Sequence, residues 1–209
     1  MSGPTTFPKL RWAAIVYLLV WGTAYTVYWG AQDLILLCNT AVILTCAGLW
    51  LGNSLLLSTQ AVSTMLIGPL WGLDLGWRIA TGGQSLIGGT EYMLDAHYPL
   101  WVRLLSCDHL VMPILLVWAL RRVGYDRRAW AAQTAVAGVV LVVSRFITPE
   151  KNLNFSYTDL LFHRAWGPPP VHLAFILLMI SALLYWPVHA VLCKIYPPPA
   201  AEKVVTNPA

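Results

Sequence analysis

The chain has 209 residues, of which 58% are hydrophobic and only 11% are charged, and its formal net charge is +4. A soluble domain carries about 25% charged residues, so this composition excludes an ordinary water-soluble globule. Several apolar runs of about 18 residues or more predict a polytopic membrane protein, because a helix of that length crosses a ~30 Å hydrocarbon core.

The predicted elements, in chain order, are six transmembrane helices that form a single bundle over residues 1–196. The apolar stretch near the N-terminus is too long for the core of a secretory signal, so we interpret it as a retained first span. A proline-rich tail, 197–209, is expected to be flexible. The spans are predicted at 12–30, 34–51, 53–75, 99–120, 129–146 and 171–195.

The positive charges indicate how these spans are oriented. Lys9 and Arg11 precede the first span, Lys194 and Lys203 accompany the end of the last, and the short loop RRVGYDRR at 121–128 joins the fourth and fifth. With six spans these regions share one side, and short basic loops favour the cytoplasmic side. The sequence therefore predicts an all-α membrane fold with both termini in the cytoplasm, in a plasma or inner membrane. Its positive charge is expected to meet anionic lipid headgroups and not nucleic acid.

Two long loops are predicted on the opposite, outer side, at 76–98 and 148–170. The first contains two Gly-Gly pairs and is interpreted either as a short interfacial helix followed by a turn-rich lid or as an ordinary connector. Tryptophans and tyrosines gather near the predicted span ends, which is typical of an aromatic belt at headgroup depth. Membrane lipids, and membrane-protein partners, are expected to contact this tryptophan-rich, lipid-facing surface.

Five polar residues at membrane depth form the candidate site. An ionisable side chain inside a span costs a few kcal/mol and normally faces the bundle interior with a partner. Cys38 and Asn39 lie near the outer end of the second span, Asp108 and His109 lie deeper in the fourth, and Asp74 ends the third. At 1.5 Å per residue from the outer face, these side chains can share one outward-opening pocket. Asp108 and His109 are adjacent and point about 100° apart, so they are not expected to face the same point.

Each of these residues also has a structural interpretation. A buried cysteine usually acts as a small hydrophobe, and an intramembrane Asn or His often only hydrogen-bonds between helices. The four cysteines have neither CxxC spacing nor partners in exposed loops. No zinc site or disulfide framework is therefore predicted, and no metal or cofactor is expected. In the third span, STQAVST at 58–64 favours close helix packing over a binding site.

Two segments resemble a known family. LILLCNTAVIL at 34–44 and RLLSCDHLVMPILLVWALRRVGYDRRAW at 103–130 resemble spans of YwaF-like integral membrane proteins, a group that includes the androgen-induced-gene type of multi-span lipid hydrolases and acyltransferase-like relatives. The resemblance covers about 34–130 and implies a nucleophile at Cys38 and a base at His109. Leu36 stands where the family pattern has His, and Asp108 precedes His109 where the pattern has Ser.

Two functions from different classes follow. The first is an intramembrane lipid acyl hydrolase or acyltransferase in which Cys38 attacks an ester and His109 takes the thiol proton. Support for the substrate or the oxyanion is expected from Asn39, Asp108 and Asp74, or from backbone amides. The alternative is a non-enzymatic accessory subunit of a larger respiratory or photosynthetic-type membrane complex, with His109, His172 or His189 as an axial ligand of a pigment or haem. A small transporter is a third interpretation, but no inverted repeat or pair of broken helices supports it.

Overall fold

The computed structural model describes residues 6–147 and 149–196, and this part of the chain is helical, without a strand. The predicted flexible tail at 197–209 lies outside the described residues. Short 3-10 helices η1 (Ala31–Ile35), η2 (Glu91–Met93), η3 (Pro149–Lys151) and η4 (Leu153–Phe155) lie in the connections. The main helices are α1 (Leu10–Tyr28), α2 (Leu37–Leu51), α3 (Ser54–Ala80), α4 (Leu100–Leu105), α5 (Asp108–Val123), α6 (Ala129–Ser144), α7 (Pro169–Ile180) and α8 (Trp186–Ile195).

Four helical segments of the described chain are long and apolar enough to cross a membrane: α1, α3, α4 with α5, and α7 with α8. The helices α2 and α6 are apolar but shorter, with 15 and 16 residues. At 1.5 Å per residue each is about 24 Å or less in length, below the ~30 Å of a hydrocarbon core. The expectation of an all-helical, membrane-type protein is thus confirmed at this level, and six complete crossings remain a prediction.

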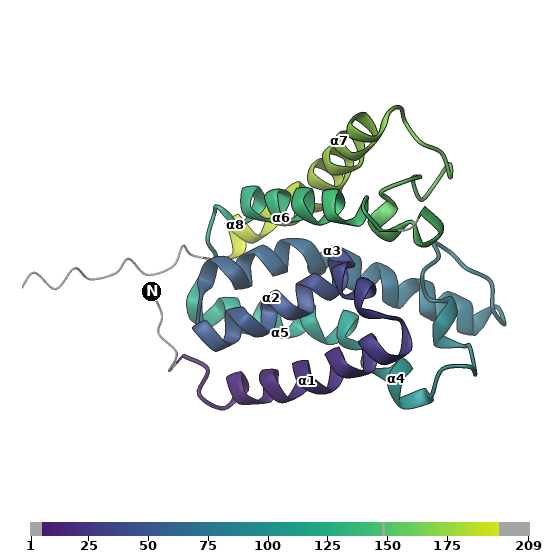
Figure 1. The fold of residues 1–209 in the computed structure, drawn as a ribbon. Helices are drawn as coiled ribbons and strands as arrows, with labels where there is room; N and C mark the ends of the chain where they lie inside the picture. Colours follow the sequence, from purple (N-terminus) through teal and green to yellow (C-terminus); the bar gives the residue numbers. More distant parts are fainter. Residues whose placement is uncertain (1–5, 148, 197–209) are drawn as a thin grey trace, which may run out of the picture.

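The helix α3 occupies the centre of the bundle, with α2 and α5 on one side and α6 on the other (Figure 1). Its segment 58–64, read as a packing surface from the sequence, is buried throughout. The helix α1 covers α2 and α5 from outside, and α7 leans away from the rest. The start of α1 and the end of α8 lie at the same end of the bundle (Figure 1).

Two predicted spans are interrupted. The fourth breaks at Ser106 and Cys107 into α4 and α5, and the sixth contains a π-helical turn, η5 (Ser181–Tyr185), between α7 and α8. The third span continues to Ala80, five residues beyond the predicted end at Leu75. Asp74 and Arg78, one turn apart near the end of α3, both bond to the loop that follows the helix. These bonds stabilise the additional turn of α3.

Glycine sets the closest approach in this bundle, where α3 meets the start of α5. A methyl group added at Gly68 would lie 2.8 Å from Pro113 Cγ and closer still to the carbonyl oxygen of His109. Ordinary carbon–carbon contacts are about 3.5–4.0 Å. Only glycine therefore lets α5 lie this close to α3 and places the His109 end of α5 against the core helix.

Candidate functional site

The structure brings Cys38 and His109 together. Cys38 is the second residue of α2 and His109 is the second residue of α5, and the N-terminal ends of these helices meet beside α3. The Cys38 thiol lies close enough to the His109 ring for the two groups to interact, and the thiol donates to Asn39 Oδ1 at 3.7 Å. Cys38 is partly accessible, whereas the His109 side chain is only 12% exposed and faces the bundle.

Asp108 and the backbone orient the His109 ring. The ring nitrogen Nδ1 lies 2.9 Å from Asp108 Oδ1 and 2.9 Å from the carbonyl oxygen of Ser106. Both partners are acceptors, so Nδ1 carries the proton and the basic lone pair of a neutral ring is on Nε2. Because Nδ1 is occupied, we infer that Nε2 faces the Cys38 thiol. The expected divergence of Asp108 and His109 does not prevent this contact, since the carboxylate reaches back to the near edge of the ring.

Asp108 is itself held by a second helix. The Tyr17 hydroxyl of α1 donates to Asp108 Oδ2 at 3.1 Å and to the carbonyl oxygen of Leu105 at 3.3 Å. The Asp108 side chain is 7% exposed. A carboxylate that is buried, fixed and bonded to Nδ1 is the arrangement that orients a general-base histidine. Sequence analysis assigned Asp108 to the pocket but did not assign it this role.

Aromatic side chains form the walls of the site. Trp71 of α3 stacks on the His109 ring, with centroids 4.8 Å apart and planes 18° apart. On the other side, the Tyr25 hydroxyl and Ser106 Oγ are 2.6 Å apart. Tyr92, from η2 in the loop after α3, interacts with Ser106 and Trp71. These walls could not be predicted from the sequence, because aromatic residues near span ends occupy the same positions as those of an interfacial aromatic belt.

The start of α2 is a favourable place for negative charge. Amides in the first turn of a helix have no carbonyl partner within it, and the helix dipole stabilises anions there. One of these amides, that of Leu37, donates to Asn154 Oδ1 at 2.8 Å, and Asn154 Nδ2 donates in turn to Ser144 Oγ and to the carbonyl oxygen of Ile35. These bonds fix the start of α2, one residue before Cys38.

Asn39 and Asp74 are engaged differently from each other. Asn39 Oδ1 lies 3.7 Å from Cys38 Sγ, and its Nδ2 donates to the carbonyl oxygen of Asp33 at 2.7 Å. Asp74 Oδ1 accepts from three successive backbone amides, those of Leu86, Ile87 and Gly88, at 2.6–3.0 Å. Asn39 is thus beside the thiol, whereas Asp74 bonds to the loop that follows α3.

Asp74 and Arg78 together fasten the loop at 81–99, called the outer loop below, to the end of α3. Asp74 also accepts from the Thr90 hydroxyl. Arg78 donates to the carbonyl oxygen of Gly83 at 2.7 Å and pairs with Glu91 Oε1 at 2.6 Å. Since Tyr92 follows Glu91, this network also positions the aromatic wall over the site.

The other histidines that were considered have partners of their own. His172 is buried, and its ring nitrogens contact the carbonyl oxygen of Phe155 and the amide of Trp166. His189 Nδ1 lies 2.7 Å from the Tyr125 hydroxyl, and Cys193 Sγ lies 3.6 Å from its Nε2. Within the described residues no group of three or more His, Cys, Asp or Glu side chains is arranged to hold a metal ion, and the four cysteines are free.

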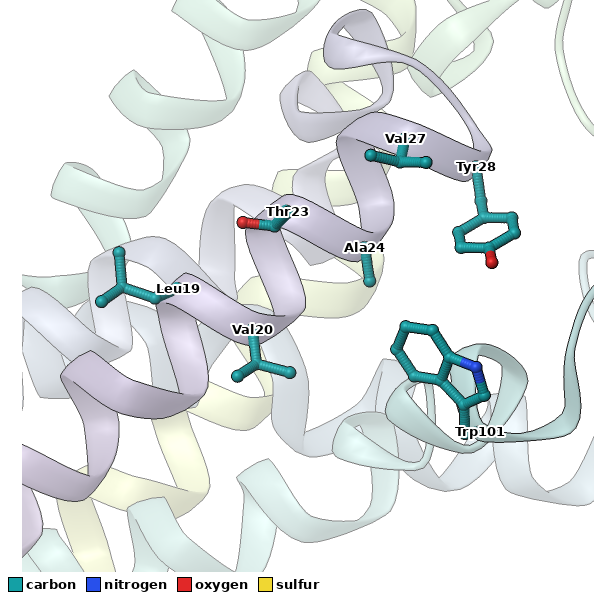
Figure 2. A pocket seen from close by; sticks show the side chains of 7 residues that line it. All are labelled: Leu19, Val20, Thr23, Ala24, Val27, Tyr28 and Trp101. Carbon is teal, nitrogen blue, oxygen red and sulfur yellow. The ribbon is translucent and has the colours of Figure 1, made fainter.

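Two hollows lie along α1. The larger, of about 490 Å³, is a shallow depression between the outer face of α1 and the Trp101 ring (Figure 2). Tyr28 and Trp101 close one end of it with ring centroids 6.0 Å apart, and none of the site residues lines it. The smaller, of about 320 Å³, lies between α1, α2 and α5, and its lining includes Tyr17 and Asp108.

No protein-family model matches the chain, and neither a curated protein nor a solved structure is found to be significantly similar to it. The resemblance to YwaF-like proteins therefore remains a hypothesis, and the function must be argued from the site itself.

Proposed function

We propose that the protein is an intramembrane lipid acyl hydrolase or acyltransferase with Cys38 as nucleophile and His109 as base. One observation carries the proposal: the thiol and the His109 ring adjoin at the meeting of two helix N-termini, and Nδ1 is held by Asp108 and Ser106. The resemblance to YwaF-like proteins, in which the two positions lie on separate spans, agrees with this assignment. We further propose six spans with both termini in the cytoplasm, in a plasma or inner membrane.

The arrangement supports a two-step acyl transfer. His109 Nε2 removes the thiol proton, and the Cys38 thiolate attacks the ester carbonyl to give a tetrahedral oxyanion. Amides in the first turn of α2 stabilise this oxyanion. As the carbon–oxygen bond breaks, His109 returns the proton to the leaving alcohol and a thioester remains on Cys38. Water or an acceptor alcohol, deprotonated by His109, then attacks the thioester and releases a fatty acid or a new ester together with the Cys38 thiol.

Paired substitutions test the assignment. The purified protein in lipid nanodiscs is treated with an acyl-chain chloromethyl ketone, and adducts are mapped by peptide mass spectrometry. We expect Cys38→Ala to remove the dominant adduct and His109→Ala to slow labelling of Cys38 by on the order of 10²-fold or more, the usual contribution of a general base. Equal labelling of Cys38 in the wild type and the His109→Ala variant would contradict the proposal.

A second Cys–His pair in the chain provides the matched control. Cys193 and His189 are one turn apart on α8, and His189 Nδ1 bonds to the Tyr125 hydroxyl where His109 Nδ1 bonds to a carboxylate. Cys193→Ala and His189→Ala repeat the same chemical changes outside the site. Both variants are expected to label at Cys38 like the wild type.

The accessory-subunit alternative makes a different prediction for the same preparation. Of the histidines suggested as axial ligands, His172 has both ring nitrogens bonded and His109 has Nδ1 bonded and Trp71 stacked on its face. These contacts leave little access for a porphyrin. Visible absorbance of the protein purified from its native membrane, or a partner in fixed stoichiometry, would favour the alternative.

A further inference from the structure

The smaller hollow, called the chain groove here, runs along the inside of α1. It has a volume of about 320 Å³, and its walls are almost entirely apolar. The polar atoms that reach it belong to a few side chains, among them Tyr17 and Asp108. The lining residues are Leu10, Ala13, Ala14, Tyr17, Val42, Thr45, Cys46, Leu49, Leu104, Leu105, Cys107, Asp108, Val111, Met112 and Leu115.

The groove begins one turn along α2 from Cys38, and its polar end is lined by Asp108 and not by Cys38 or His109. Val42, Thr45 and Leu49 line it from α2, and they follow Cys38 by four, seven and eleven residues. This spacing places them on the same side of α2 as Cys38. The seven residues from Val42 to Leu49 extend about 10 Å, so the groove runs from one turn beyond Cys38 toward the opposite end of α2.

The polar end of the groove adjoins the catalytic groups that we propose. Asp108 lines the groove and bonds to the His109 ring, and Tyr17 on the facing wall bonds to Asp108. Toward the other end the lining residues are Leu10, Leu49 and Leu115. A molecule with a reactive carbonyl at one end and a hydrocarbon chain at the other matches this polarity.

The groove also opens to the surroundings of the bundle. Leu104 and Val111, on its edge, are 53% and 58% exposed. In a bilayer that surface faces lipid, so a chain can enter sideways without crossing water. The volume is too small for a partner helix, because two turns of a helix about 10 Å wide occupy roughly 850 Å³. It lies instead within the range of small-ligand pockets.

We infer that the chain groove holds the single acyl chain that is being transferred, so that the substrate is a lipid acyl ester whose chain lies between α1, α2 and α5 with its carbonyl at Cys38. This inference rests on the proposed function and adds a substrate class to it. Chain selectivity then resides in the groove and not in the dyad, because the groove walls contact the hydrocarbon while Cys38 and His109 contact the carbonyl.

Two probes of different chain length test this inference. Butyl and dodecyl chloromethyl ketones alkylate a thiolate with release of chloride, and the rate of each at Cys38 is measured by peptide mass spectrometry in the same nanodiscs. The ratio of the dodecyl rate to the butyl rate is compared between variants, so that partitioning of the probes into lipid cancels. We expect Ala14→Phe, which fills the middle of the groove, to lower this ratio by at least about tenfold.

A matched variant and a second blocking variant complete the design. Val16→Phe adds the same ring to a lipid-exposed face of α1 outside the groove and is expected to leave the ratio unchanged. Val111→Phe narrows the groove from its exposed edge and is expected to lower the ratio even if Ala14→Phe does not fold. No labelling of wild-type Cys38 by either probe would overturn the proposed function. Labelling by both probes, with a ratio that neither blocking variant lowers or that Val16→Phe lowers equally, would overturn the groove inference alone.

Discussion

Replacement of Gly68 by Ala tests whether the contact between α3 and α5 sets the site. The new methyl group would lie 2.8 Å from Pro113 Cγ and closer to the carbonyl oxygen of His109. Since carbon–carbon contacts require about 3.5 Å, the start of α5 must move by at least ~0.7 Å. The neighbours include backbone, which cannot rotate away as a flexible side chain does, and such overpacking typically costs 1–3 kcal/mol.

The movement acts directly on the distance between the His109 ring and Cys38. A misplacement of about 1 Å at reacting groups can lower a rate by on the order of 10²-fold. We therefore expect Gly68→Ala to slow labelling of Cys38 by roughly that factor and to lower the thermal unfolding temperature in detergent. Labelling is measured with the butyl probe, which does not depend on the groove.

The same substitution at Gly76, about two turns further along α3, serves as the control. A methyl group at Gly76 meets no atom within 4 Å, and alanine favours a helix over glycine by about 0.5–1 kcal/mol. Gly76→Ala is expected to keep the labelling rate and to leave stability unchanged or raised. If Gly68→Ala behaves like Gly76→Ala in both measurements, the close approach of the helices does not position His109 and the reasoning is refuted.

Three further outcomes are expected. Asp108→Asn keeps the size of the side chain but removes the charge that orients His109, so labelling of Cys38 should slow by on the order of 10²-fold with unchanged stability; an unchanged rate would remove Asp108 from the site. Asp74→Ala removes a charged acceptor of three amides, each bond worth about 1.5 kcal/mol or more, so limited proteolysis should cleave the outer loop at least tenfold faster. Hydrogen bonds from Arg128 hold the pKa of the Asp126 carboxyl below its ordinary value, so this group stabilises the fold above pH ~4 and the effect is lost as the pH falls through the lower, folded-state pKa. The thermal unfolding temperature of Asp126→Asn should therefore fall less on acidification than that of the wild type, and the difference should be small because Arg128 is exposed.

The helices could be predicted from the sequence because each long apolar run leaves few other structures for the backbone inside a bilayer. The break at Ser106 and Cys107 could not, since both residues are compatible with a continuous helix. Polar residues inside a predicted span stand out in the sequence because burying them in a membrane is unfavourable. Cys38 and His109 could therefore be selected without knowledge of their neighbours in the fold. The depth of a residue along a span does not give its rotation about the helix axis, however, so the sequence could not assign Asp108 to the Nδ1 edge of the His109 ring.

The contacts that complete the candidate site depend on helix rotation and on long connections. Tyr17, Trp71 and Tyr92 come from two helices and a loop, and nothing in their own sequence surroundings distinguishes them from lipid-facing aromatics. The role of Gly68 could not be predicted either, because a glycine inside a span is compatible with close packing against any neighbouring helix. The helical spacing of Cys38, Val42 and Leu49 can be read from the sequence. Only the positions of α1 and α5 in the structure show that Val42 and Leu49 border a groove.

The bonds between Asn154 and the start of α2 have a consequence for biogenesis. Asn154 reaches the Leu37 amide across 117 residues of chain, in a left-handed backbone conformation with φ 54° that asparagine tolerates better than most residues. During synthesis, the helices that carry Cys38 and His109 leave the ribosome well before this segment does. A nascent chain that ends after α5 thus contains both groups without the support for α2, and reactivity at Cys38 should arise only when residue 154 has been added. Such a delay would keep the thiol from acting on lipid while the bundle is still being assembled.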